Sequence, residues 1–498
     1  MIVNMYGKNR LVKDSFLILI TNCITYIATM VNTRIISGSF SLTDYGYRAQ
    51  VISIVTIMVS VFSLGFANAP NFFIPLSNEK EKNAAEKIVR NLYLVTFGIC
   101  VLMCIIIWFG FSTIANYFDN QNLFQYRCII LLMAVEQIFY SFYSGIQISQ
   151  HRAIRATLTN LFRSLLTVID TIIVCKIFQC IFAVIVSTLI VDCAFCIYTI
   201  IDSSHPKIKL GQWIDTKLIL EMAKYCIPLG ISSITAGLCA QIDKLFVARF
   251  FTPEDLAVYS NMCTELPLAA ISGAFIAVIS PYVVKFISDK KVNQAIELWG
   301  YVIEFVAIVL FAIIAGLFTF SKQAIYILYS DKYIMGYSLF RVFVLVEISR
   351  ITYFGLMLRS YGKSMLILIC SSLTLVLDII LNSIAYFVFD AGLLGFAIAT
   401  MIATFSIQLL QLLMSCKVAK VKFLHIFPWF GLGKIGLINL IFIVIFSTII
   451  RALNLEASTN LLFFIPLFIV WIALYFVIVR KKLISLYLKI RNVDLRDI

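Results

Sequence analysis

The chain alternates long apolar runs with short polar connections. Fourteen of these runs reach the ~20 residues that a helix needs to cross the hydrocarbon core of a bilayer. They are too long for the strands of a membrane barrel, and their polarity does not alternate. Because a backbone in lipid must satisfy its own hydrogen bonds, we expect an all-α polytopic membrane protein with about 14 transmembrane helices. The runs are residues 15–38, 45–77, 91–117, 123–150, 156–177, 180–201, 218–249, 257–287, 295–328, 337–360, 364–389, 393–416, 429–450 and 461–479.

The composition indicates the same class of protein. Of the 498 residues, 61% are hydrophobic and 13% are charged, whereas an ordinary globular chain has about 25% charged residues. This composition excludes a soluble enzyme, a disordered protein and a disulfide scaffold. Nearly all of the thirteen cysteines fall within apolar runs, so we expect them to pack and not to bind metal. The first run follows a basic flank and lacks a small-residue cleavage site, which favours an uncleaved helix over a signal peptide.

The basic residues predict the orientation. If the amino terminus lies in the cytoplasm, 27 of the 40 lysines and arginines fall on the inner side and 7 on the outer side. This bias obeys the positive-inside rule and places both termini in the cytoplasm. The net charge of +14 then faces anionic lipid headgroups, and no nucleic-acid partner is needed to explain it.

A weak internal repeat divides the chain. Asp44-Tyr45-Gly46-Tyr47 begins the second run, and Asp255-Leu256-Ala257-Val258-Tyr259 begins the eighth, 211 residues later. Ser77 and Ser288, which follow the same two runs, have the same spacing. Six helices separate the copies, so both copies share one orientation, as in the repeated lobes of many secondary transporters. We expect two parallel six-helix lobes, then two additional helices and a basic cytoplasmic tail. The three parts are residues 1–210, 211–420 and 421–498.

Ionisable side chains at membrane depth are costly, so each is a functional candidate. Arg34 in the first run and Asp243-Lys244 in the seventh lie in equivalent parts of the two copies. Adjacent residues point about 100° apart on a helix, so Asp243 cannot simply neutralise Lys244. Arg48 and Arg249 lie at the outer ends of the same region, and these cations together predict a path for an anionic headgroup. Interhelical pairing, with snorkelling to the outer interface, is the alternative.

Further polar groups occur on or near these helices. Asn68, Asn71 and Asn261 supply uncharged hydrogen-bonding groups of the kind that a sugar path needs. Arg163 lies seven residues before Asp170 on the same helix face, which permits the two to neutralise each other. Acidic residues at membrane depth outnumber basic ones, so a cationic path requires that several acids face elsewhere.

Several kinds of chemistry are missing from the sequence. The three histidines, His151, His205 and His425, all fall in polar connections, so no imidazole proton relay or His-ligated metal site is expected at membrane depth. Every connection is short, which leaves no room for an ATPase module or a catalytic ectodomain. No nucleotide-binding or hydrolase motif occurs in a fitting context. We therefore predict a protein that is not an enzyme and that uses no cofactor and no metal.

Three groups of residues at helix junctions form a recognisable pattern. They are Arg34 with Asp44-Tyr45-Gly46-Tyr47; Ile227-Pro228-Leu229-Gly230 with Asp243-Lys244, Tyr259, Pro267 and Pro281; and Asn382 with Gly392-Leu393-Leu394-Gly395 and Ala397-Ile398-Ala399-Thr400. The pattern resembles the Wzx-type polysaccharide-biosynthesis flippases of the multidrug/oligosaccharidyl-lipid/polysaccharide (MOP) exporter superfamily. The resemblance runs from about residue 13 to residue 418 and leaves the last two helices uncovered.

This resemblance implies two six-helix lobes in a V around a central cavity, in the bacterial cytoplasmic (inner) membrane. It also implies a flippase that moves an undecaprenyl-diphosphate-linked oligosaccharide, an O-antigen or capsule repeat unit, from the inner to the outer leaflet by ion-gradient-driven alternating access. The expected partners are this lipid-linked oligosaccharide, a proton or sodium ion, and membrane lipids. A polysaccharide polymerase and a chain-length regulator are further candidates.

Roles for individual residues follow from the proposed chemistry. We expect Arg34, Lys244 and Arg249 to contact the diphosphate through charge-assisted hydrogen bonds. Without a histidine at membrane depth, ion coupling would fall on a buried carboxyl, with Asp243 and Glu265 as the candidates. The predicted substrate-binding residues are Arg34, Arg48, Asn68, Asn71, Arg163, Lys244, Arg249 and Asn261.

Three alternative functions are open. A multidrug antiporter of the same superfamily is the nearest, because an excess of buried carboxylates suits organic cations. A membrane-embedded polysaccharide polymerase or acyltransferase would need a large outer loop or an intramembrane histidine. A purely structural scaffold has no need of charges at mid-membrane. Loss of surface glycan, as opposed to drug hypersensitivity, in a deletion strain would separate the flippase from the antiporter.

Overall fold

The computed structural model describes residues 2–76, 84–150, 152–203, 215–351, 353–453 and 461–492. Across these ranges the regular elements are all helices, and no strand occurs among them. Ten helices in the described ranges are long and apolar enough to cross a membrane. The chain is therefore an all-α, multi-pass membrane protein. The number of fourteen spans stays a prediction.

The chain forms two compact units, Met1–Ala257 and Val258–Ile498. The predicted lobe boundary at 210/211 falls in residues 204–214, which lie outside the described ranges. The limits predicted for the lobes, and their arrangement in a V, stay predictions.

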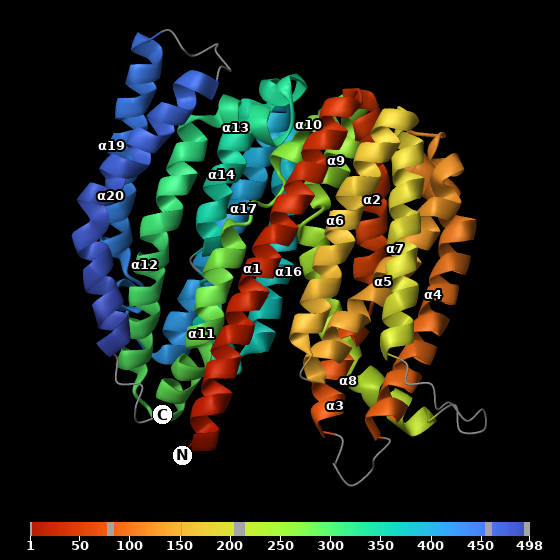
Figure 1. Ribbon diagram of the computed structural model, residues 1–498, viewed down its shortest axis with the longest axis horizontal. Helices are drawn as coiled ribbons and strands as arrows, with labels where there is room; N and C mark the ends of the chain where they lie inside the picture. The colour runs from red at the N-terminus through yellow and green to blue at the C-terminus, as the bar shows by residue number, and fades with distance from the viewer. Residues whose placement is uncertain are drawn as a thin grey trace. The chain divides into compact units, whose positions relative to one another are not determined.

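The first unit is built around α5 (Leu123–Ser149), which packs against α2 (Leu42–Phe62), α3 (Ala69–Leu76), α4 (Ala84–Tyr117) and α7 (Ile181–Ser203) (Figure 1). A helix with apolar residues on most of its circumference is expected at the centre of a bundle. The buried apolar side chains of α5 are Leu123, Tyr126, Ile130, Leu131, Ala134, Ile138, Phe142, Tyr143 and Ile146. The remaining elements are α1 (Ile2–Ser39), which packs along α6 (Ala153–Ile177), η1 (Phe66–Asn68), α8 (Thr216–Cys239), α9 (Ile242–Phe250) and α10 (Pro253–Met262), which continues into the second unit.

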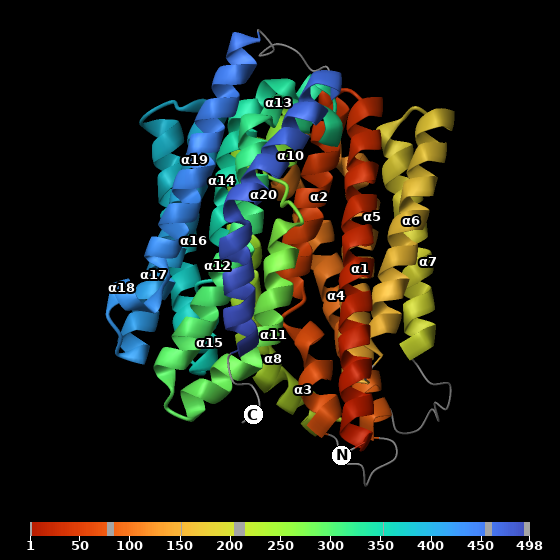
Figure 2. The same ribbon diagram turned by 60° about the vertical axis from the view of Figure 1, so that its left-hand side comes forward.

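The second unit is built around α12 (Val292–Thr319), which packs against α11 (Leu268–Ser288), α14 (Tyr337–Ile351), α19 (Trp429–Ala452) and α20 (Leu461–Asn492). In Figures 1 and 2, α19 and α20 run beside α12. An aromatic core that includes Phe320, Phe442, Phe446, Phe464 and Trp471 joins these three helices. The remaining elements are α13 (Ser321–Leu328), η2 (Asp331–Gly336), α15 (Leu356–Ser360), α16 (Ser364–Phe387), α17 (Gly392–Ala419) and α18 (Phe423–Ile426).

The apolar run 45–77 is broken after Phe62. Leu64 and Gly65 have left-handed backbone conformations, with φ of 45° and 73°, which end α2. At the break, Gly65 lies against Gly230 of α8, because a Cβ atom added to Gly65 would come within 2.5 Å of the Gly230 backbone nitrogen. The joint between α2 and η1 therefore packs against α8 through two glycines.

Three other predicted runs are also discontinuous. Run 218–249 contains most of α8 and α9, run 257–287 contains most of α10 and α11, and run 337–360 contains α14 and α15. Pro267 precedes α11, and Tyr353 before α15 has φ of 46°. Broken helices at membrane depth present backbone groups that need partners, which is why transporters use them at binding sites.

The local structure repeats with the spacing seen in the sequence. The helices α2 and α10, α6 and α16, and α7 and α17 each begin 211 residues apart. The turns that precede α7 and α17 contain Gln179 and Asp390, which are also 211 residues apart and have φ of 48° and 45°. Both copies therefore use the same left-handed turn to close a helical hairpin.

Candidate functional site

Matched caps begin α2 and α10. The Ser41 hydroxyl accepts a hydrogen bond from the Asp44 backbone N–H at 3.1 Å and donates one to the Asp44 carboxylate at 2.6 Å. Thr252 and Asp255 make the same two contacts, at 3.2 Å and 2.8 Å. Such a cap satisfies N–H groups that the first turn of a helix leaves without partners. The residues that first indicated the repeat therefore form the same local structure in both copies.

The two helix starts also contact each other within the first unit. The Thr43 hydroxyl donates a hydrogen bond to the carboxylate of Glu254, its equivalent in the repeat. This hydrogen bond holds the pKa of the Glu254 carboxyl below its usual value.

Two predicted cations lie near the start of α2. Arg34 is half-buried on α1, and its guanidinium lies close to Gly38, where an added Cβ atom would be 3.3 Å from Nη1. Arg48 is half-buried on α2, with its guanidinium 5.5 Å from the centre of the Tyr45 ring. Among the described residues, Arg48 has no hydrogen-bond or ion-pair partner.

Asp243 and Lys244 lie in the first turn of α9, directly after the break in the seventh run. Asp243 is 4% exposed, and its carboxylate accepts a hydrogen bond from the Lys244 backbone N–H at 2.8 Å. A carboxylate at this position is stabilised by the unpaired N–H groups and the partial positive charge of a helix start. Lys244 is half-buried beside it.

Arg249 caps another helix. Its Nη1 donates hydrogen bonds to the carbonyl oxygens of Asn116 and Tyr117 at 3.0 Å and 3.1 Å. These carbonyls belong to the last turn of α4, where helix acceptors lack intrahelical donors. The guanidinium also lies 6.0 Å from the centre of the Tyr117 ring. Arg249 therefore joins α9 to the end of α4 within the first unit.

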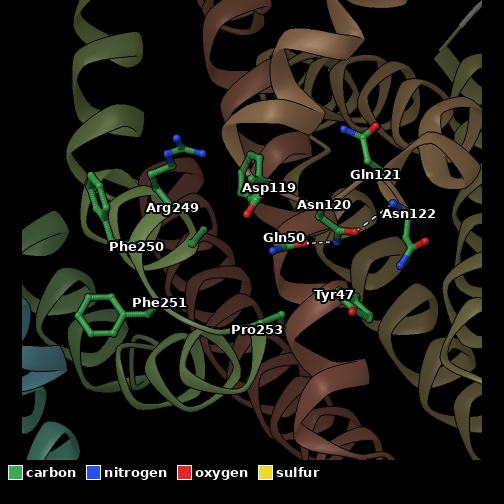
Figure 3. A pocket seen from close by; sticks show the side chains of 12 residues that line it. Tyr47, Gln50, Asp119, Asn120, Gln121, Asn122, Arg249, Phe250, Phe251 and Pro253 are labelled. Atoms are coloured by element: carbon green, nitrogen blue, oxygen red, sulfur yellow. Dashed lines mark hydrogen bonds between the residues drawn. The ribbon is translucent and has the colours of Figure 1, made fainter.

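A pocket of about 470 Å³ opens beside this cap (Figure 3). The start of α2, the loop between α4 and α5, and the junction of α9 with α10 form its walls. Its lining residues are Tyr47, Gln50, Phe118, Asp119, Asn120, Gln121, Asn122, Ala248, Arg249, Phe250, Phe251 and Pro253.

A second polar cluster lies in the interior of the first unit, on α5, α6 and α7. Nε of Arg163 lies 2.8 Å from Oδ1 of Asp192, and its Nη2 lies 3.2 Å from Oε1 of Glu136. The guanidinium also lies over the Tyr140 ring, 4.2 Å from its centre. Glu136 is 3% exposed and Asp192 is 9% exposed. Two carboxylates thus surround one guanidinium, and the ionised cluster carries a formal charge of −1.

The suggested neutralisation of Arg163 by Asp170 is wrong. Asp170 is seven residues further along α6, which is about 10.5 Å at the rise of an α-helix and too far for an ion pair. The partners of Arg163 come instead from the two helices packed against α6. In the described part of the chain, Oδ2 of Asp170 is buried and has no hydrogen-bond partner.

The remaining predicted site residues lie at helix breaks. Asn261 is buried near the end of α10, and its carbonyl accepts a hydrogen bond from the Tyr329 hydroxyl at 2.7 Å. Glu265 is exposed in the segment that joins α10 to α11. Asn68 ends η1 and Asn71 lies in α3, and the side chains of both are outside the described part of the structure.

Sequence reasoning did not find the loop between α4 and α5. The signal for it is a run of four polar residues, Asp119-Asn120-Gln121-Asn122, in a connection between two strongly apolar helices. Glu136 and Asp192 are recognisable from the sequence as acids at membrane depth, but nothing in the sequence joins them to Arg163.

Comparison with protein families places the chain. The model of a family described as "Polysaccharide biosynthesis protein" matches residues 31–336, which is more than half of the chain. The chain belongs to this polysaccharide biosynthesis protein family. No curated protein matches it.

Solved structures show the fold of this family member. The lipid II flippase MurJ, in an inward closed conformation, superposes with a TM-score of 0.71 at 18% identity, covering 97% of this chain and 99% of that one. An inward-facing multidrug resistance transporter of the MATE family gives a TM-score of 0.64 at 13% identity, covering 80% and 94%. A MOP superfamily transporter from Pyrococcus furiosus gives 0.53 at 16% identity, covering 82% and 95%. The chain therefore has the fold of MOP-type flippases and transporters.

Proposed function

We propose that this protein is a flippase that moves an undecaprenyl-diphosphate-linked oligosaccharide from the inner to the outer leaflet of the bacterial cytoplasmic membrane. The extent of the structural match carries the proposal. The MurJ structure covers 97% of the chain, whereas the MATE and Pyrococcus transporter structures cover 80% and 82%. The family match to polysaccharide biosynthesis proteins agrees with a glycan as cargo.

The physical problem for such a protein is the charged headgroup. A diphosphate with attached sugars cannot leave water for hydrocarbon unless other groups replace its hydration. Arginine and lysine replace it with charge-assisted hydrogen bonds, and the lipid tail can stay in the bilayer. We propose Arg34, Arg48, Lys244 and Arg249 as the cations that contact the diphosphate. Arg48 has the strongest support, because it lacks a polar partner among the described residues.

Uncharged contacts would serve the sugars. We propose the amides of Asn68, Asn71 and Asn261 for this role, since all three lie at or next to helix breaks. Arg163 is the least favoured of the predicted contacts, because two carboxylates already hold its guanidinium.

An ion gradient would drive the cycle. We propose Asp243 as the carboxyl that takes up a proton or sodium ion, with Glu265 as the alternative. Asp243 is buried at a helix break, whereas Glu265 is exposed. Burial disfavours the charged form of a carboxyl more than exposure does, so a buried carboxyl gains more from binding a proton or a cation.

Charge reversal tests the substrate contacts. In a strain that depends on this gene for surface polysaccharide, Arg34→Glu and Lys244→Glu should abolish glycan assembly at normal protein level. Lys176→Glu, at the exposed carboxyl end of α6, is the matched control and should leave assembly intact. Normal glycan in the double variant Arg34→Glu/Lys244→Glu would overturn the assignment.

A multidrug antiporter is the second candidate. The surplus carboxylate of the Glu136–Arg163–Asp192 cluster and the likeness to MATE transporters favour it. Hypersensitivity of a deletion strain to cationic drugs, with surface glycan unchanged, would support the antiporter and contradict the flippase.

A further inference from the structure

The pocket beside the α4 cap has the construction of a small-molecule site. Its volume of about 470 Å³ lies within the ~300–1,000 Å³ of typical ligand pockets. Three separate segments of the first unit meet there, and none of the residues predicted to bind substrate lines it except Arg249. Figure 3 shows Arg249, Phe250 and Phe251 on one side, Gln121, Asn122 and Tyr47 on the other, and Gln50 with Asn120 between them.

Hydrogen bonds hold the walls in place. Nδ2 of Asn120 donates to Oε1 of Gln50 at 2.7 Å, which ties the loop to α2. The backbone N–H of Asn122 donates to Oδ1 of Asn120 at 3.0 Å, and Asp119 turns the loop with φ of 47°. The contacts of Arg249 with the end of α4 fix the opposite wall. The lining groups are therefore preorganised, which lowers the entropy lost on binding.

One polar atom of a buried side chain is left over for a ligand. Gln50 is 2% exposed, and its oxygen is used by Asn120. Its amide nitrogen has no hydrogen-bond partner among the described residues. Figure 3 shows this nitrogen on the side away from Asn120, facing the Arg249 and Phe251 wall. This nitrogen is therefore available to donate to water or to a ligand in the pocket.

The lining chemistry indicates the class of ligand. Four side-chain amides supply paired donors and acceptors, and Tyr47, Phe118, Phe250 and Phe251 supply aromatic rings. Asp119 and Arg249 give the lining one negative and one positive charge, so the pocket has no net charge for a phosphate. Hydroxyl groups both donate and accept, and the C–H faces of sugar rings pack on aromatic rings. An uncharged sugar matches both sets of groups.

We propose that this pocket is a carbohydrate-binding subsite of the first unit, separate from Arg34, Arg48 and Lys244, with Arg249 as the one proposed diphosphate contact in its lining. The inference rests on the proposed function and on the predicted orientation, in which the loop between α4 and α5 faces outward. On that basis the pocket receives sugars of the cargo after they reach the outer side. Because release must follow, binding there is weak.

The glycan alone is the probe. Mild acid releases the water-soluble oligosaccharide from the lipid-linked pool of the host strain, and the full chain is held in lipid nanodiscs. Saturation-transfer difference NMR should show transfer from the wild-type protein to this glycan. Gln50→Glu keeps the oxygen that accepts from Asn120 and removes the free donor, so affinity should fall by about tenfold or more, as when a buried hydrogen bond is lost. Gln125→Glu, an exposed residue of α5 outside the pocket, is the matched control and should bind as wild type.

A second variant covers the case in which Gln50→Glu does not fold. Phe251→Leu keeps an apolar side chain and removes the aromatic face, and should weaken glycan binding by about threefold to tenfold. Wild-type affinity in both folded variants would overturn the proposal. The proposal would also be overturned if the free glycan gave no saturation-transfer signal with the wild-type protein while the intact lipid-linked oligosaccharide bound to it. That result would still agree with the flippase function. If neither compound binds, the proposed function fails as well.

Discussion

Two arginines of the first unit show how the position of a cation determines which groups compensate its charge. Arg163 lies among three spanning helices, where two carboxylates and an aromatic ring surround its guanidinium. Arg249 lies exposed at a helix end, where its Nη1 donates hydrogen bonds to two carbonyl oxygens and where the residue lines a polar pocket. A charge in an apolar interior must be compensated by the protein itself, whereas a charge at the edge can be compensated by water or by a ligand. Candidate substrate contacts are therefore better sought at helix ends and breaks.

The largest effect is expected from removal of the interior cation. Arg163→Met leaves Glu136 and Asp192 buried without a counter-charge, and should destabilise the protein by about 3–5 kcal/mol. The measurement is the yield and thermal midpoint of the protein in nanodiscs. Glu136→Gln is the informative companion, because it leaves a neutral Arg163–Asp192 pair and should be neutral or stabilising. Equal damage from both variants would show that the surplus negative charge does not determine the stability of the cluster.

The edge cation should matter less for stability. Arg249→Ala removes two hydrogen bonds to the end of α4, and exposure reduces their worth to about 1–2 kcal/mol. The thermal midpoint of unfolding should fall by less than in Arg163→Met, while the core of the first unit stays protected from hydrogen exchange. A loss of stability as large as that of Arg163→Met would contradict the idea that an interior cation matters more for stability than a cation at a helix end.

The matched caps provide a smaller and symmetrical test. Ser41→Ala and Thr252→Ala each remove the side-chain cap of a helix start, at about 1 kcal/mol. Because the two copies have the same contacts, the two variants should lower the midpoint by similar amounts. Ser288→Ala, at the end of α11, is a control with no helix start to cap. A loss of stability in only one of the two variants would mean that the two caps have the same geometry but contribute differently to stability.

The sequence predicts the helices far better than it predicts their interruptions. Apolar runs specify α4, α6, α7 and α12, because length and hydropathy are properties of each segment alone. The break at Gly65 depends on its contact with Gly230, and the partners of Arg163 come from α5 and α7. Such contacts depend on tertiary packing, which periodicity does not encode. The spacing of 211 is the exception, because it is a property of the sequence alone and predicts equivalent helix starts in both copies.

The smallest effect concerns an acid at the start of α8. Asp215 accepts hydrogen bonds from the backbone N–H groups of Lys217 and Leu218, and its Oδ2 lies 2.6 Å from Nζ of Lys87. The hydrogen bond with Lys87 and the backbone bonds hold the pKa of this carboxyl below its usual value. A carboxyl whose pKa is lowered in the folded state stabilises the protein at pH values above its unfolded pKa of about 3.9. This contribution is lost as the pH falls through the lower folded value.

The thermal midpoint of wild type should therefore exceed that of Asp215→Asn at pH 6, and the gap should narrow as the pH falls below about 4. Asparagine keeps an oxygen for the two backbone bonds, so the comparison isolates the charge. Lys87→Gln removes the largest cause of the shift and should remove most of the pH dependence of the gap. A gap that stays constant from pH 6 to pH 3 would mean that the ion pair contributes nothing to stability, as is often found for exposed pairs. Asp215 would then act only as a helix cap.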